Sequence, residues 1–206
     1  MLYKSYLLEN NLESLNKNIT LFYGENLGLI NEFKKKIKFK KDFEFLIFDQ
    51  EEIVKNKNVI LNEINNLSLF EKKKIFFINN VTDKMLEIIK FVHHSDAKQK
   101  LYLFAGILEK KSKLREFFEK SKEHGCVPCY ADNEASIKAI ILNKLKGFQG
   151  LNTININTII QNCSMDRSKL NNEISKIFSY FDDKKIHEDK LEKLLNDTSN
   201  DNFNLL

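Results

Sequence analysis

The chain has 206 residues, of which 42% are hydrophobic and 30% charged, so it can form an ordinary core and is not a disordered polymer. Its net charge of +4 and pI of about 8.7 suit a negatively charged partner without requiring one. No apolar run approaches the roughly 18 residues of a membrane span, and the segment Met1–Tyr6 has no signal-peptide pattern. We therefore expect a cytoplasmic protein.

The first part of the chain alternates apolar strands with amphipathic helices. We expect strands at 19–23, 43–48, 74–78, 101–104 and 126–130, and helices at 26–38, 51–66 (in one or two pieces), 83–92 and 112–124. Asn26 and Ser112 suit helix N-caps, and Pro128 suggests either an outer strand or a strand end. Strands separated by helices of this length predict a parallel sheet that is covered on both faces.

From residue 132 onwards the strand pattern stops. Asp132 or Asn133 can cap a helix to about Lys146, which Gly147 and Gly150 end. Further helices are expected near 155–162, 166–181 and 187–195. The sequence thus predicts an α/β domain over residues 1–131 and a small all-helical domain over residues 132–200.

The first strand ends at a glycine, where a nucleotide-binding P-loop would begin. A P-loop needs Gly-x4-Gly-Lys-Ser/Thr, so that backbone amides cradle phosphate, the lysine neutralises it and the hydroxyl binds magnesium. Counted from Gly24, the lysine and hydroxyl positions hold Ile30 and Asn31. An apolar side chain cannot neutralise phosphate, and Glu25 would repel it.

The third strand is followed by Asn79 and Asn80, where a nucleoside triphosphatase carries an acidic pair that holds magnesium and polarises water. Two amides cannot do this. The first domain is therefore either a nucleotide-binding topology without its catalytic parts or an unrelated parallel sheet that never bound nucleotide. We predict no catalytic constellation.

Two apolar side chains follow a predicted helix within Leu67-Ser68-Leu69-Phe70, just before the charged run 71–74. Connections between elements are normally polar and solvated. Leu69 and Phe70 are therefore either the rim of the core or a contact with another protein.

Lysines supply nearly all of the positive charge. The densest run comprises Lys34, Lys35, Lys36, Lys38, Lys40 and Lys41. It is either a solvated helix end or a diffuse contact with DNA phosphates. The only arginines are Arg115 and Arg167, which argues against a dedicated reader of base sequence.

Cys126 and Cys129 have the spacing of a redox or zinc half-site. A redox pair normally begins a helix, where the helix dipole lowers the thiol pKa, whereas this pair lies in a predicted strand. Zinc needs a second ligand pair, and Cys163 does not complete one with His124 or His187. We expect neither role.

Several segments, taken in order, resemble the delta subunit of the bacterial DNA polymerase III clamp loader. They are Leu-Phe-Tyr-Gly-Glu at 21–25, Asn-Leu-Ser-Leu-Phe at 66–70, Lys-Leu-Arg at 113–115, Cys-Tyr-Ala-Asp at 129–132, and a helix with Asp166, Arg167, Leu170, Glu173 and Lys176. They are spread over nearly the whole chain, and their order and spacing carry the resemblance.

This resemblance implies an AAA+-type α/β domain and a helical lid, with residues 201–206 at the start of a collar domain, so that the chain would be a fragment or a truncated form. It implies a subunit of the DNA polymerase III holoenzyme, a nucleotidyltransferase complex, that itself hydrolyses no ATP and needs no cofactor or metal. Such a subunit binds the sliding clamp and opens the ring for loading onto primed DNA. The clamp contact falls on Leu69 and Phe70, with Leu67 and Ser68 supporting it.

The partners implied are the clamp (beta subunit), the gamma/tau and delta prime subunits, and primed DNA in the assembled complex, with no membrane. Two rival functions remain. A divergent AAA+ ATPase would bind ATP with magnesium, and a general DNA-binding module using the lysine run would bind DNA with strong salt dependence.

Overall fold

A computed structural model describes residues 1–39, 43–65, 73–93 and 99–196. The chain divides into two compact units, Met1–Tyr130 and Ala131–Leu206. Within the described ranges, no helix combines the length and the apolar character needed to cross a membrane.

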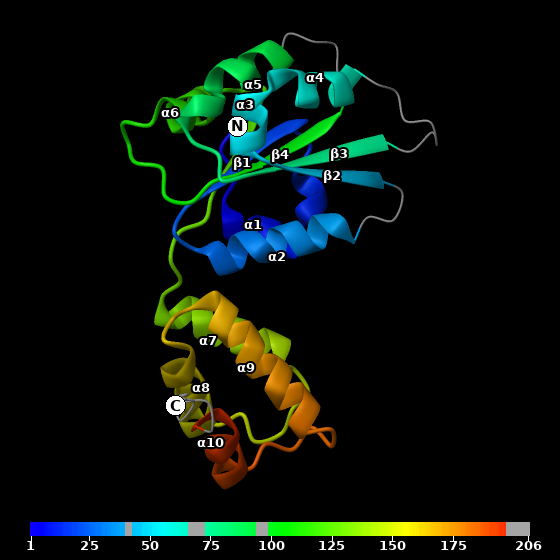
Figure 1. Cartoon of the computed structure of the whole chain (residues 1–206). Coiled ribbons are helices and arrows are strands. Elements are labelled where there is room, and N and C mark those ends of the chain that lie inside the picture. Colours follow the sequence, from blue (N-terminus) through cyan, green and yellow to red (C-terminus); the bar gives the residue numbers. More distant parts are fainter. Residues whose placement is uncertain (40–42, 66–72, 94–98, 197–206) are drawn as a thin grey trace, which may run out of the picture. The chain divides into compact units, whose positions relative to one another are not determined.

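The first unit contains a five-stranded sheet in the order β2-β3-β4-β1-β5 (Figure 1). The strands are β1 (Ile19–Tyr23), β2 (Phe43–Asp49), β3 (Lys73–Asn79), β4 (Lys100–Phe104) and β5 (Gly125–Pro128). Every neighbouring pair is parallel. All strands therefore begin at one end of the sheet, the amino end, and finish at the other, the carboxyl end. The expected parallel α/β sheet is confirmed.

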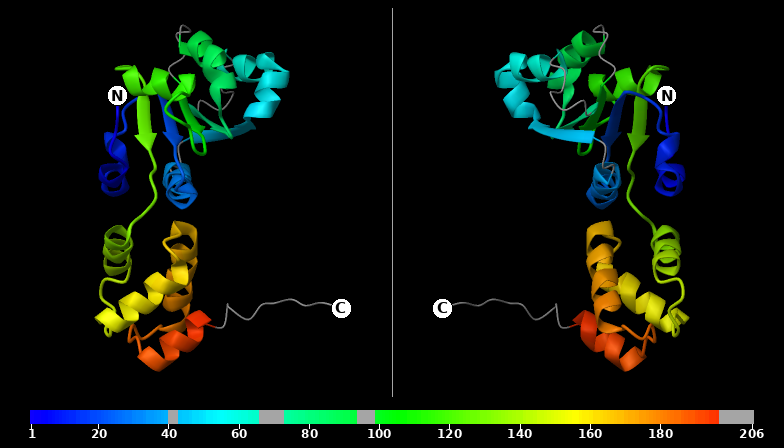
Figure 2. Two further views of the ribbon diagram at one scale, coloured as in Figure 1. Left: turned by 90° about the vertical axis from the view of Figure 1, so that its left-hand side faces the viewer. Right: turned by 90° about the vertical axis from the view of Figure 1, so that its right-hand side faces the viewer.

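Helices cover both faces of this sheet, as two side views also show (Figure 2). One face carries α1 (Ser5–Asn10), the 3-10 turn η1 (Leu12–Ser14) and α2 (Leu27–Lys38). The other carries α3 (Gln50–Lys55), α4 (Lys57–Asn65), η2 (Asp83–Met85), α5 (Leu86–His93) and α6 (Lys113–Lys120). Because successive strand side chains point to opposite faces, Phe22 and Phe77 enter the core under α2, while Leu21 and Phe76 enter the other core.

The helix α2 follows from its sequence. Asn26 caps it, and its buried side chains are Leu29, Ile30, Phe33 and Ile37, the face expected from their spacing. The short α1 was not predicted, because it has no side-chain cap and Leu8 is its one buried residue.

Two predicted boundaries were wrong. The helix α6 ends at Lys120 and not at His124, because the Ser121 hydroxyl accepts from the backbone amides of Glu123 (3.1 Å) and His124 (3.0 Å) and turns the chain. The strand β5 ends at Pro128, two residues earlier than expected, and lies at the outside of the sheet, as its proline suggests.

The second unit packs α7 (Glu134–Lys144), α8 (Thr153–Cys163), α9 (Arg167–Tyr180) and α10 (Glu188–Asn196) around one apolar core. Asn133, and not Asp132, caps α7. Gly150 has a φ of +83°, and a Cβ there would lie 2.2 Å from the Ile186 carbonyl oxygen, so glycine is required at the turn after α7.

Candidate functional site at the two ends of the sheet

The connection from β1 to α2 is only Gly24, Glu25 and Asn26. Gly24 has a φ of +141°, and a Cβ there would lie 2.1 Å from the Cys129 carbonyl oxygen. The Gly24 amide donates to the Gly106 carbonyl (3.0 Å), and the Asn26 amide donates to the Cys129 carbonyl (3.1 Å). The connection therefore packs closely against the residues that follow β4 and β5, and two of its backbone amides donate hydrogen bonds to them.

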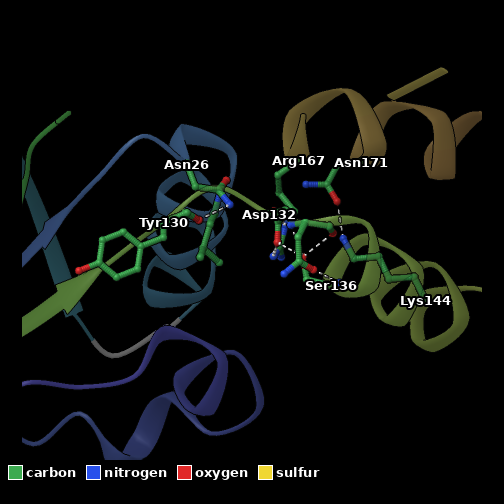
Figure 3. Close-up of polar contacts among 9 residues, drawn as sticks. Asn26, Tyr130, Asp132, Ser136, Lys144, Arg167 and Asn171 are labelled. Atoms are coloured by element: carbon green, nitrogen blue, oxygen red, sulfur yellow. Dashed lines mark hydrogen bonds and ion pairs between the residues drawn. The ribbon is translucent and has the colours of Figure 1, made fainter. Parts of the chain in front are cut away.

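Asn26 closes the amino terminus of α2. Its Oδ1 accepts from the Leu29 amide (2.9 Å), and its Nδ2 donates to the Tyr130 carbonyl (3.1 Å) (Figure 3). The amides at such a terminus are the groups that a P-loop offers to phosphate. Here the side-chain oxygen of Asn26 already accepts from one of these amides.

The P-loop lysine and hydroxyl positions fall inside α2. Ile30 is buried in the core beside Phe33, while Asn31 is exposed. A buried isoleucine at position 30 places no cation where a P-loop lysine would contact phosphate.

The two asparagines after Ile78 also make internal contacts. Asn79 Oδ1 accepts from Lys34 Nζ (2.8 Å), whose ammonium lies 4.5 Å from the centre of the Phe104 ring. Asn80 Nδ2 donates to Asp49 Oδ2 (2.5 Å). Burial lowers the pKa of the Lys34 ammonium, and the positive charge of the nearby Lys38 lowers it further. Asn79 and Asn80 stand where a nucleoside triphosphatase carries its acidic pair, and here they join β3 to α2 and β2.

The lysine run consequently does not form one solvated row. Besides Lys34, Lys36 Nζ donates to the Glu9 carbonyl (2.7 Å) and Lys38 Nζ lies 5.7 Å from the Phe77 ring. Lys35 is exposed, and Lys40 and Lys41 lie outside the described residues.

A charged cluster at the carboxyl end was not foreseen. Glu119 Oε1 accepts from the Tyr23 hydroxyl (2.7 Å) and from Arg115 Nε (2.8 Å), and Arg115 Nη1 donates to the Leu108 carbonyl (3.0 Å). Burial acts to raise the pKa of Glu119, but these hydrogen bonds outweigh it and lower the pKa. One of the two arginines is thereby committed to contacts within its own unit.

The other arginine forms a buried ion pair in the second unit. Arg167 Nε and Nη2 each lie 2.8 Å from a carboxylate oxygen of Asp132, which also accepts from the Ser136 hydroxyl (2.8 Å) (Figure 3). Lys144 donates to Asn171 nearby. This bidentate pair attaches the start of α9 to the residue before the cap of α7.

Cys126 and Cys129 are both buried. Burial raises the pKa of the Cys126 thiol to about 12, so this sulfur has little thiolate for redox or zinc chemistry. Within the described part of the chain, no three His, Cys, Asp or Glu side chains are grouped so that they could hold a metal ion.

The predicted clamp-contact residues, Leu67, Ser68, Leu69 and Phe70, lie outside the described residues. The elements on either side of them are well anchored at the amino end of the sheet. Lys74 Nζ, near the start of β3, lies 2.8 Å from Glu63 Oε2 of α4.

A second contact holds the end of α4 at the amino end of the sheet. Gln99 Nε2, beside the start of β4, donates to the Ile64 carbonyl (2.8 Å). This carbonyl lies in the last turn of α4, where backbone oxygens lack helical partners. These two contacts therefore hold α4 against the starts of β3 and β4.

Comparison with known proteins bears on the fold. No protein-family model matches the chain, and no curated protein sequence matches it. The chain is similar to the solved structure of a Bacillus subtilis DNA clamp loader delta protein (YqeN), with 15% identity and a TM-score of 0.63, over 92% of this chain and 62% of that one.

Two further solved structures are similar. They are Trip13 from Rhizobiales (10% identity, TM-score 0.52, 93% of this chain and 80% of that one) and Thermotoga maritima RuvB (10%, 0.50, 93% and 67%). The chain spans about three fifths of the length of the clamp loader delta structure. The likeness confirms the predicted α/β fold, an AAA+-type parallel sheet flanked by helices.

Proposed function

We propose that this chain is a delta-type clamp-loader subunit, which hydrolyses no ATP and binds the sliding clamp through Leu69 and Phe70. The observation that carries the proposal is the amino terminus of α2, where the Asn26 side chain accepts from the Leu29 amide and donates to the Tyr130 carbonyl, so that it covers the place where a P-loop would offer its amides to phosphate. An AAA+-type sheet that lacks a usable phosphate site suggests that the chain acts by binding other subunits and not by hydrolysing ATP.

Several contacts support the non-catalytic part of the proposal. The Gly24 and Asn26 amides donate to the carbonyls of Gly106 and Cys129, which follow β4 and β5. Ile30 stands at the lysine position, and Asn79 accepts from Lys34. Opening this region to a triphosphate would break those bonds and still provide neither the cation nor the acidic pair that phosphoryl transfer requires.

The clamp contact is proposed at the opposite end of the sheet. Burial of one leucine and one phenylalanine gives roughly 3–6 kcal/mol before association costs, which consume much of it. The contacts of Lys74 and Gln99 with α4 support this role, because they hold the described elements on either side of the pair in place. Leu67 and Ser68 would support the pair.

Ring opening adds a thermodynamic condition. The clamp opens only if the chain binds the open ring more tightly than the closed ring. We propose that this occurs in a cytoplasmic loader with gamma/tau and delta prime subunits and primed DNA, as the resemblance to delta subunits implies.

The test is sliding-clamp binding by surface plasmon resonance, with the whole chain as analyte. The Leu69→Ala/Phe70→Ala variant is expected to bind at least about tenfold more weakly than wild type, with an unchanged Tm. Ile107→Ala, exposed at the carboxyl end, is the matched control and should bind like wild type. A correctly folded double variant with wild-type affinity contradicts the proposal, and a fall in stability of several kcal/mol would place the pair in the core.

A further inference from the structure

We infer that the clamp-contact surface extends across the amino end of the sheet to Phe39 and Phe91, and that it fits an acidic protein surface with apolar hollows. The inference rests on the proposed function, because it names further residues of the same contact.

The need for further contacts follows from size. A phenylalanine side chain buries about 150–250 Å², whereas a stable interface covers about 800 Å² on each partner. Leu69 and Phe70 would supply only part of this area. Neighbouring residues at the same end of the sheet must supply the remainder.

Phe39 and Phe91 are placed at this end by the fold. Phe39 directly follows α2 and lies four residues before Phe43, the first residue of β2. Phe91 is in the last turn of α5, which leads into β4. In Figure 1, α2 and α4 both end on the side of the sheet where β2 and β3 start.

Both rings are largely exposed, Phe39 at 83% and Phe91 at 63%. Their neighbours on the packing faces of the same helices, Ile37 and Val92, are buried. The two phenylalanines therefore do not serve the core. Exposed aromatic side chains are the type that most often dominates the energy of protein interfaces.

Among the described residues, the charges at this end are mostly positive. Lysines in or next to the amino-end elements are Lys35, Lys38, Lys73 and Lys100. Two nearby carboxylates are already neutralised, Glu63 by Lys74 (2.8 Å) and Glu87 by Lys90 (2.9 Å), while Glu44 is a further acidic residue there. An acidic partner complements this surface.

Helix dipoles explain only part of this pattern. Lys35 and Lys38 are in the last turn of α2, where cations stabilise a helix. Lys73 begins a strand, where no such reason exists. The carboxyl end also exposes apolar residues, Leu27 (59%) and Ile107 (71%), but among charges of both signs such as Glu109 and Lys111. The carboxyl end also exposes the Tyr130 ring (58%), so the amino end differs in the excess of lysines over acidic residues beside its rings.

The experiment measures sliding-clamp binding by the full chain with Phe39→Ala, Phe91→Ala and Lys73→Glu, against Ile107→Ala as control. Each phenylalanine variant is expected to bind roughly five- to thirtyfold more weakly. Lys73→Glu should slow association and make it less sensitive to salt, and the control should stay within about twofold.

The outcomes separate this inference from the proposed function. If both phenylalanine variants and Lys73→Glu bind like wild type while Leu69→Ala/Phe70→Ala binds weakly, the extended surface is refuted and the proposed function stands. If the double variant also keeps wild-type affinity, or wild type does not bind the clamp, the proposed function fails and this inference fails with it.

Discussion

The two ends of one sheet differ in how they use their polar and apolar groups. At the carboxyl end, Gly24, Asn26 and Asn79 all bond within the unit, and Arg115 is held by Glu119. At the amino end, Phe39 and Phe91 face solvent among lysines. The polar groups at the carboxyl end are thus used inside the unit, whereas the amino end exposes two aromatic rings.

The largest effect is expected from Gly24→Ala. The new Cβ would collide with the Cys129 carbonyl, and alanine is strained at a φ of +141°. We expect the free energy of unfolding to fall by about 3 kcal/mol or more, measured by urea denaturation. Gly106→Ala is the control, because a methyl group at that position would have no described atom within 4 Å. Equal losses in both variants would show that the carboxyl end is not closely packed.

A smaller loss is expected from Asn26→Ala, which removes both the cap of α2 and the bond to the Tyr130 carbonyl. Loss of such a cap lowers the free energy of unfolding by about 1–2 kcal/mol. Asn26→Asp keeps the cap acceptor and should lose less. Neither variant should gain ATP affinity, because position 30 remains isoleucine. Magnesium-dependent ATP binding by Asn26→Ala would mean that the cap alone blocks a working site.

Asp83 should make stability sensitive to acid. It accepts from the Ser112 hydroxyl (2.6 Å) and the Leu114 amide (3.0 Å), and these bonds lower its pKa in the folded state. The stabilisation is therefore complete above the unfolded-state pKa and is lost as pH falls through the lower folded-state pKa. Urea denaturation at about pH 6 and about pH 3 should show a smaller difference for Asp83→Asn than for wild type. The same difference in both proteins would exclude Asp83 as a source of acid sensitivity.

The smallest effect on stability is expected at the amino end. Phe91→Ala should change the free energy of unfolding by no more than about 0.5 kcal/mol, because its ring is mostly in solvent. Ile89→Ala in the same helix is the matched variant, with a buried side chain and an expected loss of about 2–5 kcal/mol. Comparable losses from the two variants would place Phe91 in the core.

Local patterns predicted most of the fold. The apolar run Ile19–Tyr23, bounded by a glycine, is β1, and the caps Asn26, Ser112 and Asn133 begin their helices as expected. The end of α6 was missed because a serine side chain turns the chain there.

The site was only partly readable from the sequence. The missing lysine and acidic pair are visible at Ile30, Asn79 and Asn80. The contacts that these and neighbouring residues make are not visible in the sequence. Asn26 contacts Tyr130, 104 positions away, and Tyr23 contacts Glu119, 96 positions away. Contacts between residues so distant in the chain leave no local pattern. The assignment of the clamp contact to Leu69 and Phe70 remains a prediction.

From these contacts we propose that the amino end of the sheet binds the clamp and that the carboxyl end does not bind nucleotide. Calorimetric titration of the sliding clamp into the whole chain, with and without saturating MgATP, examines both ends together. We predict saturable clamp binding with the same Kd in both conditions and no heat of ATP binding to the chain alone. Absence of clamp binding, or saturable ATP binding that changes the clamp Kd, would contradict the proposal.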